Sequence, residues 1–460
     1  MARKKLFVDG DIANTIHQVW DLYTTSQAAK GVCDITLRNC VFRAAESDFK
    51  IPSSGRIRLV SHSRMCYTFP VIKSKCRFCC VWGSSQMNIL IAADYAAPAS
   101  GNFIGSMMEL GKHLSANGSS ISFVFPSSEN TTRDGSWTRW LGKEGFRVFL
   151  IDMTQSLEDQ FLFLRTIITE CQIDILHIHF GLFHSLAIHR RDQLPVEIII
   201  HEHMEYPAGC NHMKQSLRFM ARSVVYRAKR IRVISVNKTV DAAYCFARHY
   251  YIPNGLSFSR NNQSSLTREQ CRSTLGFNAD DKIVLFLGWD LYRKGLDIAI
   301  KAINECRKKD PNIILGLIGV GNSDECRYFI QNRTGISPDV PWIKQLHGGE
   351  DMFSYHRAAD VYLSASRSEA FSYGLLEAIS QNTPIVVSDI AGTRWSMEYN
   401  RSYSYPVEDP QKCAGAILDA LADNHTDTTN AQEMIEKYSI ENWIQRIEQV
   451  YTETMPRKKR

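Results

Sequence analysis

Two glutamates eight residues apart, Glu369 and Glu377, lie in the segment SRSEAFSYGLLEAISQ. The apolar run DVYLSAS precedes them, so the sequence predicts a strand, a loop that carries Glu369, and a helix that begins near Ser372 or Tyr373. The amide groups at the start of such a helix attract phosphate, because the helix dipole is positive at that end. The arrangement suits a sugar nucleotide, with its sugar near Glu369 and its ribose near Glu377.

Four residues around the predicted helix start are expected to turn their amide groups toward the phosphate. They are Phe371, Ser372, Tyr373 and Gly374. Two carboxylates at this spacing are more often an unrelated loop residue and helix residue on the surface. The pair by itself therefore does not establish a binding site.

The longer segment ASRSEAFSYGLLEAISQNTPIVVSDIAG resembles, almost from end to end, the signature of family 4 glycosyltransferases. The matching residues are Ser366, Glu369, Phe371, Leu376, Glu377, Ala378, Pro384 and Gly392. The family has glycine where this chain has Ala370 and Asn382, and neither change removes a chemical group. The resemblance implies a metal-independent, retaining glycosyltransferase in which Glu369 binds the transferred sugar and Glu377 binds the ribose of the donor.

A second motif, FLGWDLYRKGLDIAI, resembles the family pattern of a strand, Gly-Arg, four residues and Lys-Gly. Gly288 and Lys294 match, and the resemblance implies that Lys294 neutralises the departing diphosphate. Trp289 stands where the family has its arginine, which makes Arg293 the candidate for a second positive charge. An Arg-Lys-Gly sequence at a helix start is commonly solvent-facing when it lies outside such a context.

Three glycines after strands are further candidates for donor binding. Gly101 lies between Ser100 and Asn102 in the first strand-to-helix loop, where the family usually has two adjacent glycines. Gly319 and Gly321 follow a later strand, where the nucleotide is expected to approach the backbone. Their spacing does not form the dinucleotide-binding fingerprint.

Four histidines lie at strand ends in DILHIHF and IIIHEHMEYP. The family often has a histidine near the transferred sugar, and both His201 and His203 stay candidates, with His203 preferred. His177 and His179 are expected to be structural. No metal site is expected, on the argument that alternating strand residues face opposite sides and that no cysteine or carboxylate cluster completes a site.

The elements that position these residues alternate between strand and helix in two successive stretches. The segment YIPNGLSFSRNNQSS, rich in Pro, Gly, Asn and Ser, separates them. The sequence therefore predicts an α/β chain with two Rossmann-like parallel-sheet domains facing across a cleft, the GT-B arrangement. The expected divisions are an N-terminal extension at 1–86, an acceptor-side domain at 87–255, a nucleotide-sugar domain at 256–430, and a C-terminal helix with a basic tail at 431–460 that packs on the N-terminal domain.

Composition limits the function classes. The 460 residues are 44% hydrophobic and 22% charged, which is typical of globular proteins, and the longest apolar runs are strand-sized. Thirteen cysteines, an odd number without a framework, indicate reduced thiols. The positive charge is concentrated before Met87, so nucleic acid is not expected as a partner, and the first residues lack the apolar stretch of a secretory signal. A cytoplasmic location is expected.

The sequence thus favours transfer of a hexose or N-acetylhexosamine from a nucleotide-diphosphate sugar to a hydroxyl of a glycan or lipid-linked acceptor, in surface polysaccharide or glycolipid synthesis. No cofactor is expected. The basic segment MKQSLRFMARSVVYRAKR indicates either peripheral contact with the inner face of the plasma membrane or a solvated helix face. Two alternatives stay open, namely a nucleotide-sugar 2-epimerase of the same fold and a binding protein without catalysis.

Overall fold

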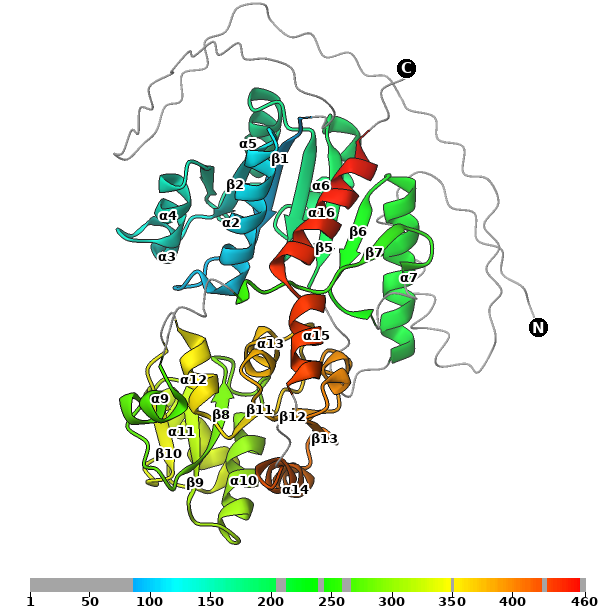
Figure 1. Cartoon of the computed structure of the whole chain (residues 1–460). Helices are drawn as coiled ribbons and strands as arrows, with labels where there is room; N and C mark the ends of the chain where they lie inside the picture. The colour runs from blue at the N-terminus through cyan, green and yellow to red at the C-terminus, as the bar shows by residue number, and fades with distance from the viewer. Residues whose placement is uncertain are drawn as a thin grey trace, which may run out of the picture. The chain divides into compact units, whose positions relative to one another are not determined.

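The computed structural model of the chain describes residues 86–203, 212–238, 244–258, 266–348, 351–423 and 428–455, and only the backbone of residues 212–216. The expected N-terminal extension up to residue 85 and the basic tail after residue 455 lie outside these ranges. The described residues contain two parallel β-sheets, each accompanied by helices (Figure 1). The expected pair of parallel-sheet domains is confirmed, and we call them the N-terminal and C-terminal lobes.

The N-terminal lobe is built on seven parallel strands in the order β3-β2-β1-β4-β5-β6-β7. These are β1 Asn88–Ala93, β2 Ser120–Pro126, β3 Arg147–Ile151, β4 Ile175–His179, β5 Glu197–Glu202, β6 Arg232–Ser235 and β7 Arg248–Tyr251. The accompanying helices are α2 Gly101–Ala116, α3 Glu129–Thr132, α4 Trp137–Lys143, α5 Leu157–Glu170, α6 His184–His189, the 3-10 turn η1 Arg191–Gln193 and α7 His212–Ala228. Leu90 belongs to one apolar cluster, and Ile89 and Ile91 to another, because successive strand residues face opposite sides of the sheet.

The C-terminal lobe has six parallel strands in the order β10-β9-β8-β11-β12-β13. These are β8 Lys282–Leu287, β9 Ile313–Ile318, β10 Ile343–Leu346, β11 Val361–Ser364, β12 Ile385–Ser388 and β13 Ser402–Tyr405. The helices are α9 Arg268–Thr274, α10 Leu296–Arg307, α11 Asp324–Thr334, α12 Met352–Ala358, α13 Tyr373–Ser380, the 3-10 turn η3 Arg394–Glu398 and α14 Pro410–Leu421. Loops at the carboxyl ends of β8 and β11 carry Lys294 and Glu369, which is the edge where open parallel sheets bind ligands.

The last two helices pack on different lobes. The expected boundary between residues 430 and 431 falls inside α15 Thr429–Lys437, whose Ala431 and Met434 join an apolar cluster of the C-terminal lobe. α16 Ile440–Thr454 instead packs against α2, and its Trp443 and Ile447 join a cluster of the N-terminal lobe (Figure 1). The change of lobe occurs at Ser439, whose side chain accepts a hydrogen bond from the first turn of α16.

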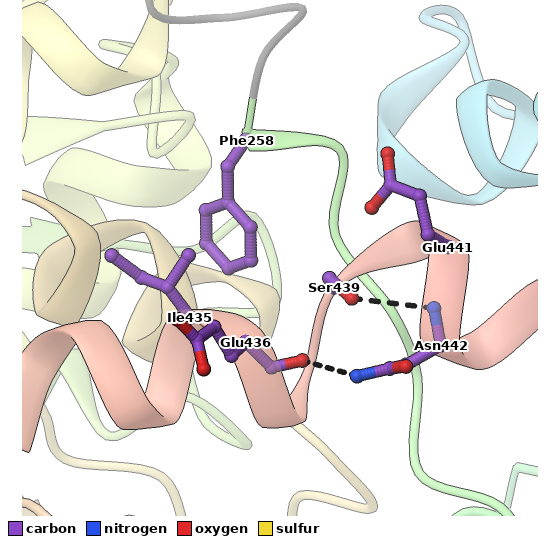
Figure 2. A pocket seen from close by; sticks show the side chains of 6 residues that line it. All are labelled: Phe258, Ile435, Glu436, Ser439, Glu441 and Asn442. Carbon is purple, nitrogen blue, oxygen red and sulfur yellow. Dashed lines mark hydrogen bonds between the residues drawn. The ribbon is translucent and has the colours of Figure 1, made fainter.

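The junction between α15 and α16 borders a cavity of about 450 Å³. Figure 2 shows its lining residues, Phe258, Ile435, Glu436, Ser439, Glu441 and Asn442. Asn442 donates hydrogen bonds from its backbone N–H to Ser439 Oγ at 3.2 Å and from Nδ2 to the Glu436 carbonyl oxygen at 2.5 Å. None of the sequence-predicted site residues lies here, so we treat this cavity as a feature of the helix junction. No helix in the described part of the chain is long and apolar enough to span a lipid bilayer.

Candidate active site

The structure brings Glu369 and Lys294 into a direct ion pair. Lys294 Nζ donates to Glu369 Oε2, and Arg293 Nη1 lies 3.8 Å from the same oxygen. The side chains of Lys294 and Glu369 are only 18% and 12% exposed. Two loops from neighbouring strands therefore bring a carboxylate and two cations to one place.

Two glycines make this approach of the two loops sterically feasible. A Cβ on Gly288 would lie 2.6 Å from Lys294 Cγ, so any larger residue at position 288 would clash with the lysine side chain. Gly295 has φ +75°, and a Cβ there would lie 2.0 Å from the Ala365 carbonyl oxygen. This explains why glycine follows Lys294 in the motif, because only glycine lets the loop pack against the end of β11.

Helix α13 begins beside this ion pair. Ser372 is its N-cap residue and makes no side-chain capping hydrogen bond. The first N–H groups of any α-helix have no partner within the helix, so they are available to an anion. Phe371, 5% exposed, stacks on Trp395 with ring centroids 4.4 Å apart, and this contact fixes the backbone that leads into the helix.

A cavity of about 460 Å³, which we call the central cavity, opens at this point. From the N-terminal lobe it is lined by Phe103, Phe180, His203, Val236 and Asn254. From the C-terminal lobe it is lined by Arg293, Ser368, Glu369, Ala370, Phe371 and Tyr373. Of the sequence-predicted residues, it therefore gathers His203, Arg293, Glu369, Phe371 and Tyr373, with Lys294 joined through its ion pair.

Glu377 has a different environment from Glu369. It is 2% exposed and is not among the residues that line the central cavity. Asn102 Nδ2, from the start of α2 in the N-terminal lobe, donates a 2.8 Å hydrogen bond to Glu377 Oε1, and His356 Nε2 lies 3.4 Å from Oε2. The carboxylate thus faces the other lobe, although a side chain occupies the position that a ribose was expected to take.

The predicted glycines are not among the residues that line the central cavity. Gly101, Gly319 and Gly321 all have positive φ angles; Gly101 is the first residue of α2, and Gly319 and Gly321 lie in the loop after β9. Gly374 packs so closely in α13 that a Cβ would lie 2.3 Å from Tyr362 Oη. Gly319 is close to Gly288, since its Cβ would lie 3.9 Å from the Gly288 carbonyl carbon.

His203, not His201, reaches the central cavity. His201 is 2% exposed and lies behind it, where its Nδ1 is 3.2 Å from His177 Nε2. His203 Nε2 lies 3.0 Å from His179 Nδ1. Burial lowers the pKa of His203 to about 3, so its imidazole is neutral at physiological pH.

The prediction that alternation along the strands places these histidines on opposite faces of the sheet was wrong. His177 and His179 are two residues apart on β4 and share a face, and His179 is paired with His201 across β4 and β5. Ligand atoms of these three residues all lie within 4.8 Å of one another, which is a group that could hold a metal ion. Tyr451 Oη of α16 lies 2.7 Å from His177 Nδ1, so this cluster also links α16 to the sheet.

Arg367 was not among the residues predicted for the site. Its guanidinium makes two 2.9 Å hydrogen bonds to Asp297 and also pairs with Glu408, and its backbone N–H donates to the Arg293 carbonyl oxygen at 2.7 Å. The signal was available, since Arg367 stands two residues before Glu369. Asn102 was noted only as a departure from the family's paired glycines, yet it contacts the predicted ribose-binding carboxylate.

The chain is similar to known glycosyltransferases over both lobes. Residues 267–442 match the family model described as "Glycosyl transferases group 1". An uncharacterized glycosyltransferase of Methanocaldococcus jannaschii is 24% identical over 295 residues, which are 60% of this chain and 75% of that protein. The mannosylfructose-phosphate synthase of Agrobacterium fabrum is 27% identical over 247 residues, which are 50% of this chain and only 52% of that protein.

Solved structures share the fold. A glycosyltransferase from Rickettsia africae superposes with a TM-score of 0.65 at 15% identity, covering 82% of this chain and 100% of that one. Anabaena HepE in complex with UDP-glucose has a TM-score of 0.64 at 15% identity and covers 80% of this chain and 100% of its own. These likenesses show the GT-B fold. The match to the group 1 family model and the glycosyltransferase relatives indicate that the class is a glycosyltransferase. Within it, the C-terminal lobe carries the segment that matches the group 1 family.

Proposed function

We propose that this protein transfers a hexose or N-acetylhexosamine from a nucleotide-diphosphate sugar to a hydroxyl of a glycan or lipid-linked acceptor, with retention of anomeric configuration. The observation that carries the proposal is the Lys294–Glu369 ion pair beside the start of α13, at the wall of the central cavity. The solved complex of HepE with UDP-glucose supports a nucleotide sugar as the donor.

In the proposed complex the diphosphate lies at the amide end of α13. Lys294 leaves Glu369 and donates to the diphosphate, where it stabilises the negative charge that develops as the glycosidic bond breaks. Arg293, 3.8 Å from Glu369, is close enough to add a second charge. These groups supply positive charge at the leaving group, and for that reason we propose that the reaction needs no metal ion or other cofactor.

The carboxylates have separate tasks in this proposal. Glu369, freed from Lys294, accepts hydrogen bonds from hydroxyls of the donor sugar. Glu377 accepts from the ribose hydroxyls after the Asn102 amide moves away. His203, neutral and facing the central cavity, is positioned to hydrogen-bond the transferred sugar or the acceptor. The departing phosphate takes the proton of the acceptor hydroxyl, so no separate pair of acid and base carboxylates is required.

The acceptor and the site of action are part of the proposal. We place the reaction in surface polysaccharide or glycolipid synthesis, on the cytoplasmic side of a membrane, with no nucleic acid partner. Leu217 and Val224 of α7 are each 43% exposed, and Arg227 is exposed one turn further along the same helix. Exposed apolar and basic residues on one helix favour contact with an anionic lipid surface.

A donor screen tests the proposal. The purified chain is incubated with UDP-, GDP- and ADP-linked sugars, with and without EDTA, and free nucleoside diphosphate is measured. We expect one donor to be hydrolysed slowly, at a rate that EDTA does not change, with release of the α-sugar from an α-linked donor. Conversion of the donor to an epimerised sugar nucleotide, or binding without any turnover in the presence of acceptor glycans, would contradict the proposal.

A further inference from the structure

Trp289 is 77% exposed, the most exposed of the large hydrophobic residues that the structure describes. It directly follows Gly288 at the carboxyl end of β8, the edge of the sheet where ligands bind. Tryptophan carries the largest apolar surface of any side chain and usually buries most of it. Trp289 does not itself line the central cavity, but it contacts Arg293, which does, so its open face is available to a ligand that enters there.

Arg293 contacts the indole of Trp289 and also lines the central cavity. The Arg293 guanidinium carbon lies 5.8 Å from the centre of the Trp289 ring, within the range of a cation–π contact. Asp290 holds this arginine through hydrogen bonds of 3.0 Å from Nε and 3.1 Å from the backbone N–H. Arg293 also lines the central cavity, and its Nη1 lies 3.8 Å from Glu369 Oε2. Arg293 therefore links Trp289 to Glu369 through two successive contacts.

The chemistry of these three side chains fits a sugar ring. One face of a pyranose carries C–H groups whose partial positive charge complements the negative face of an indole. Its hydroxyl rim needs hydrogen-bonding groups around that contact, and Arg293 and Glu369 supply a donor and an acceptor there. A tryptophan carries no charge and cannot neutralise a phosphate. Trp289 therefore cannot have the role of the arginine that the resemblance to family 4 glycosyltransferases implies at this position.

We propose that Trp289 is a stacking platform for the sugar ring of the donor. This inference rests on the proposed function, because Glu369 is the residue assigned there to the donor sugar. It adds a specificity-determining residue: Trp289 recognises the transferred sugar and makes no contribution to the binding of the nucleoside diphosphate.

The test compares each nucleotide with its sugar. Isothermal titration of UDP against UDP-glucose, and of GDP against GDP-mannose, is carried out on the full-length wild type and on Trp289→Ala and Trp289→Phe. We expect Trp289→Ala to bind the free nucleoside diphosphate within twofold of wild type and to bind the preferred nucleotide sugar about tenfold more weakly. Trp289→Phe, which keeps an aromatic face, should recover most of that loss.

Tyr328→Ala is the matched control, since Tyr328 is a 71% exposed aromatic residue on α11 and should change neither affinity. The inference is overturned if Trp289→Ala weakens the free diphosphate and the nucleotide sugar equally, if it changes neither, or if Tyr328→Ala has the same effect. Wild-type protein that binds none of these four ligands and no other sugar nucleotide of the donor screen would instead overturn the proposed function, and this inference with it.

Discussion

Asn102 in the N-terminal lobe donates a hydrogen bond from Nδ2 to Glu377 Oε1 in the C-terminal lobe, at 2.8 Å. A carboxylate that is 2% exposed needs such partners, because an unpaired buried charge is costly. The contact provides a partner for Glu377 Oε1, and in the proposed complex the ribose hydroxyls replace the amide at the carboxylate. Asn102 is thus a competitor of the proposed ligand.

Asn102→Ala should therefore tighten binding of the nucleoside diphosphate. Hydrogen bonds to charged groups contribute about 1.5 to 3 kcal/mol, and we expect part of this, roughly three- to tenfold in Kd, by titration calorimetry. Glu377→Ala should do the opposite and weaken the same ligand at least about tenfold. Asn130→Ala, which removes a 3.0 Å bond to the Ala96 carbonyl oxygen within one lobe, is the control. Equal weakening by Asn102→Ala and Glu377→Ala would show that Asn102 assists the ligand instead.

Lys294→Met should lower turnover more than it weakens donor binding. The lysine charge is assigned to the departing diphosphate, and losing one preorganised group of this kind typically costs about 2.7 to 4 kcal/mol, or 10² to 10³ in kcat. Initial rates over a range of donor concentrations separate kcat from KM. Lys308→Met is the control for the loss of a positive charge, because the Lys308 side chain is 65% exposed and lies just past the end of α10. A normal kcat for Lys294→Met would show that Lys294 does not stabilise the departing diphosphate.

Arg367→Lys should reduce activity because it shifts the two loops that carry Lys294 and Glu369. Arg367 does not line the central cavity. It bridges Asp297 at the start of α10 and Glu408 after β13, and its backbone N–H donates to the Arg293 carbonyl oxygen. A lysine cannot reproduce these paired hydrogen bonds. We expect kcat to fall at least about tenfold, since displacement of reacting groups by about 1 Å can cost 10².

Arg401→Lys provides a matched comparison for that variant. The Arg401 and Asp423 side chains are 11% and 2% exposed, close to the 10% and 8% of Arg367 and Asp297. Thermal melts should show similar losses of stability for both substitutions, whereas kcat should fall only for Arg367→Lys. Equal kcat losses would mean that Arg367 acts through general stability alone.

Stability should fall as the pH falls below about 6.5. Burial, with a contribution from His203, lowers the pKa of His177 to about 3, and burial also holds the pKa values of His179 and His201 well below the usual value. The unfolded chain binds these protons at a pKa near 6.5, so acid favours unfolding until the pH nears the folded pKa. Each such histidine contributes up to about 1.4 kcal/mol per pH unit.

Urea melts at pH 7.5 and pH 5 measure this slope. His177→Phe removes one titrating group and should reduce the loss of stability between the two pH values. His189→Phe, at an exposed histidine at the end of α6, should leave the loss unchanged. A wild-type protein that is equally stable at both pH values would show that the histidine cluster takes up protons without unfolding.

The fold could be predicted where strands are buried on both faces. β1, β8 and β12 are largely apolar and β5 has three consecutive isoleucines, because helices cover both sides of each sheet. The edge strands β7 and β13 escaped prediction, because their sequences RHYY and SYSY are partly exposed and show no apolar run. Their presence depends on pairing with β6 and β12, and the sequence does not show that pairing.

The candidate site was predictable residue by residue only where a local pattern exists. Glu369, Lys294 and the start of α13 lie in short motifs, and the structure brings Glu369 and Lys294 together. Asn102 meets Glu377 across 275 positions of sequence, and Arg367 meets Glu408 across 41, so no local pattern marks them. The partnership of Asn102 with Glu377 also depends on the approach of two lobes, which no single motif encodes.

The most direct test of the central claim is a crystal structure of the protein with the nucleoside diphosphate of its preferred donor. We expect the β-phosphate within hydrogen-bonding distance of the first amides of α13 and of Lys294 Nζ, with the ribose on Glu377 and Asn102 displaced. A nucleotide bound elsewhere, with Lys294 still paired to Glu369 and Asn102 still bonded to Glu377, would contradict the account.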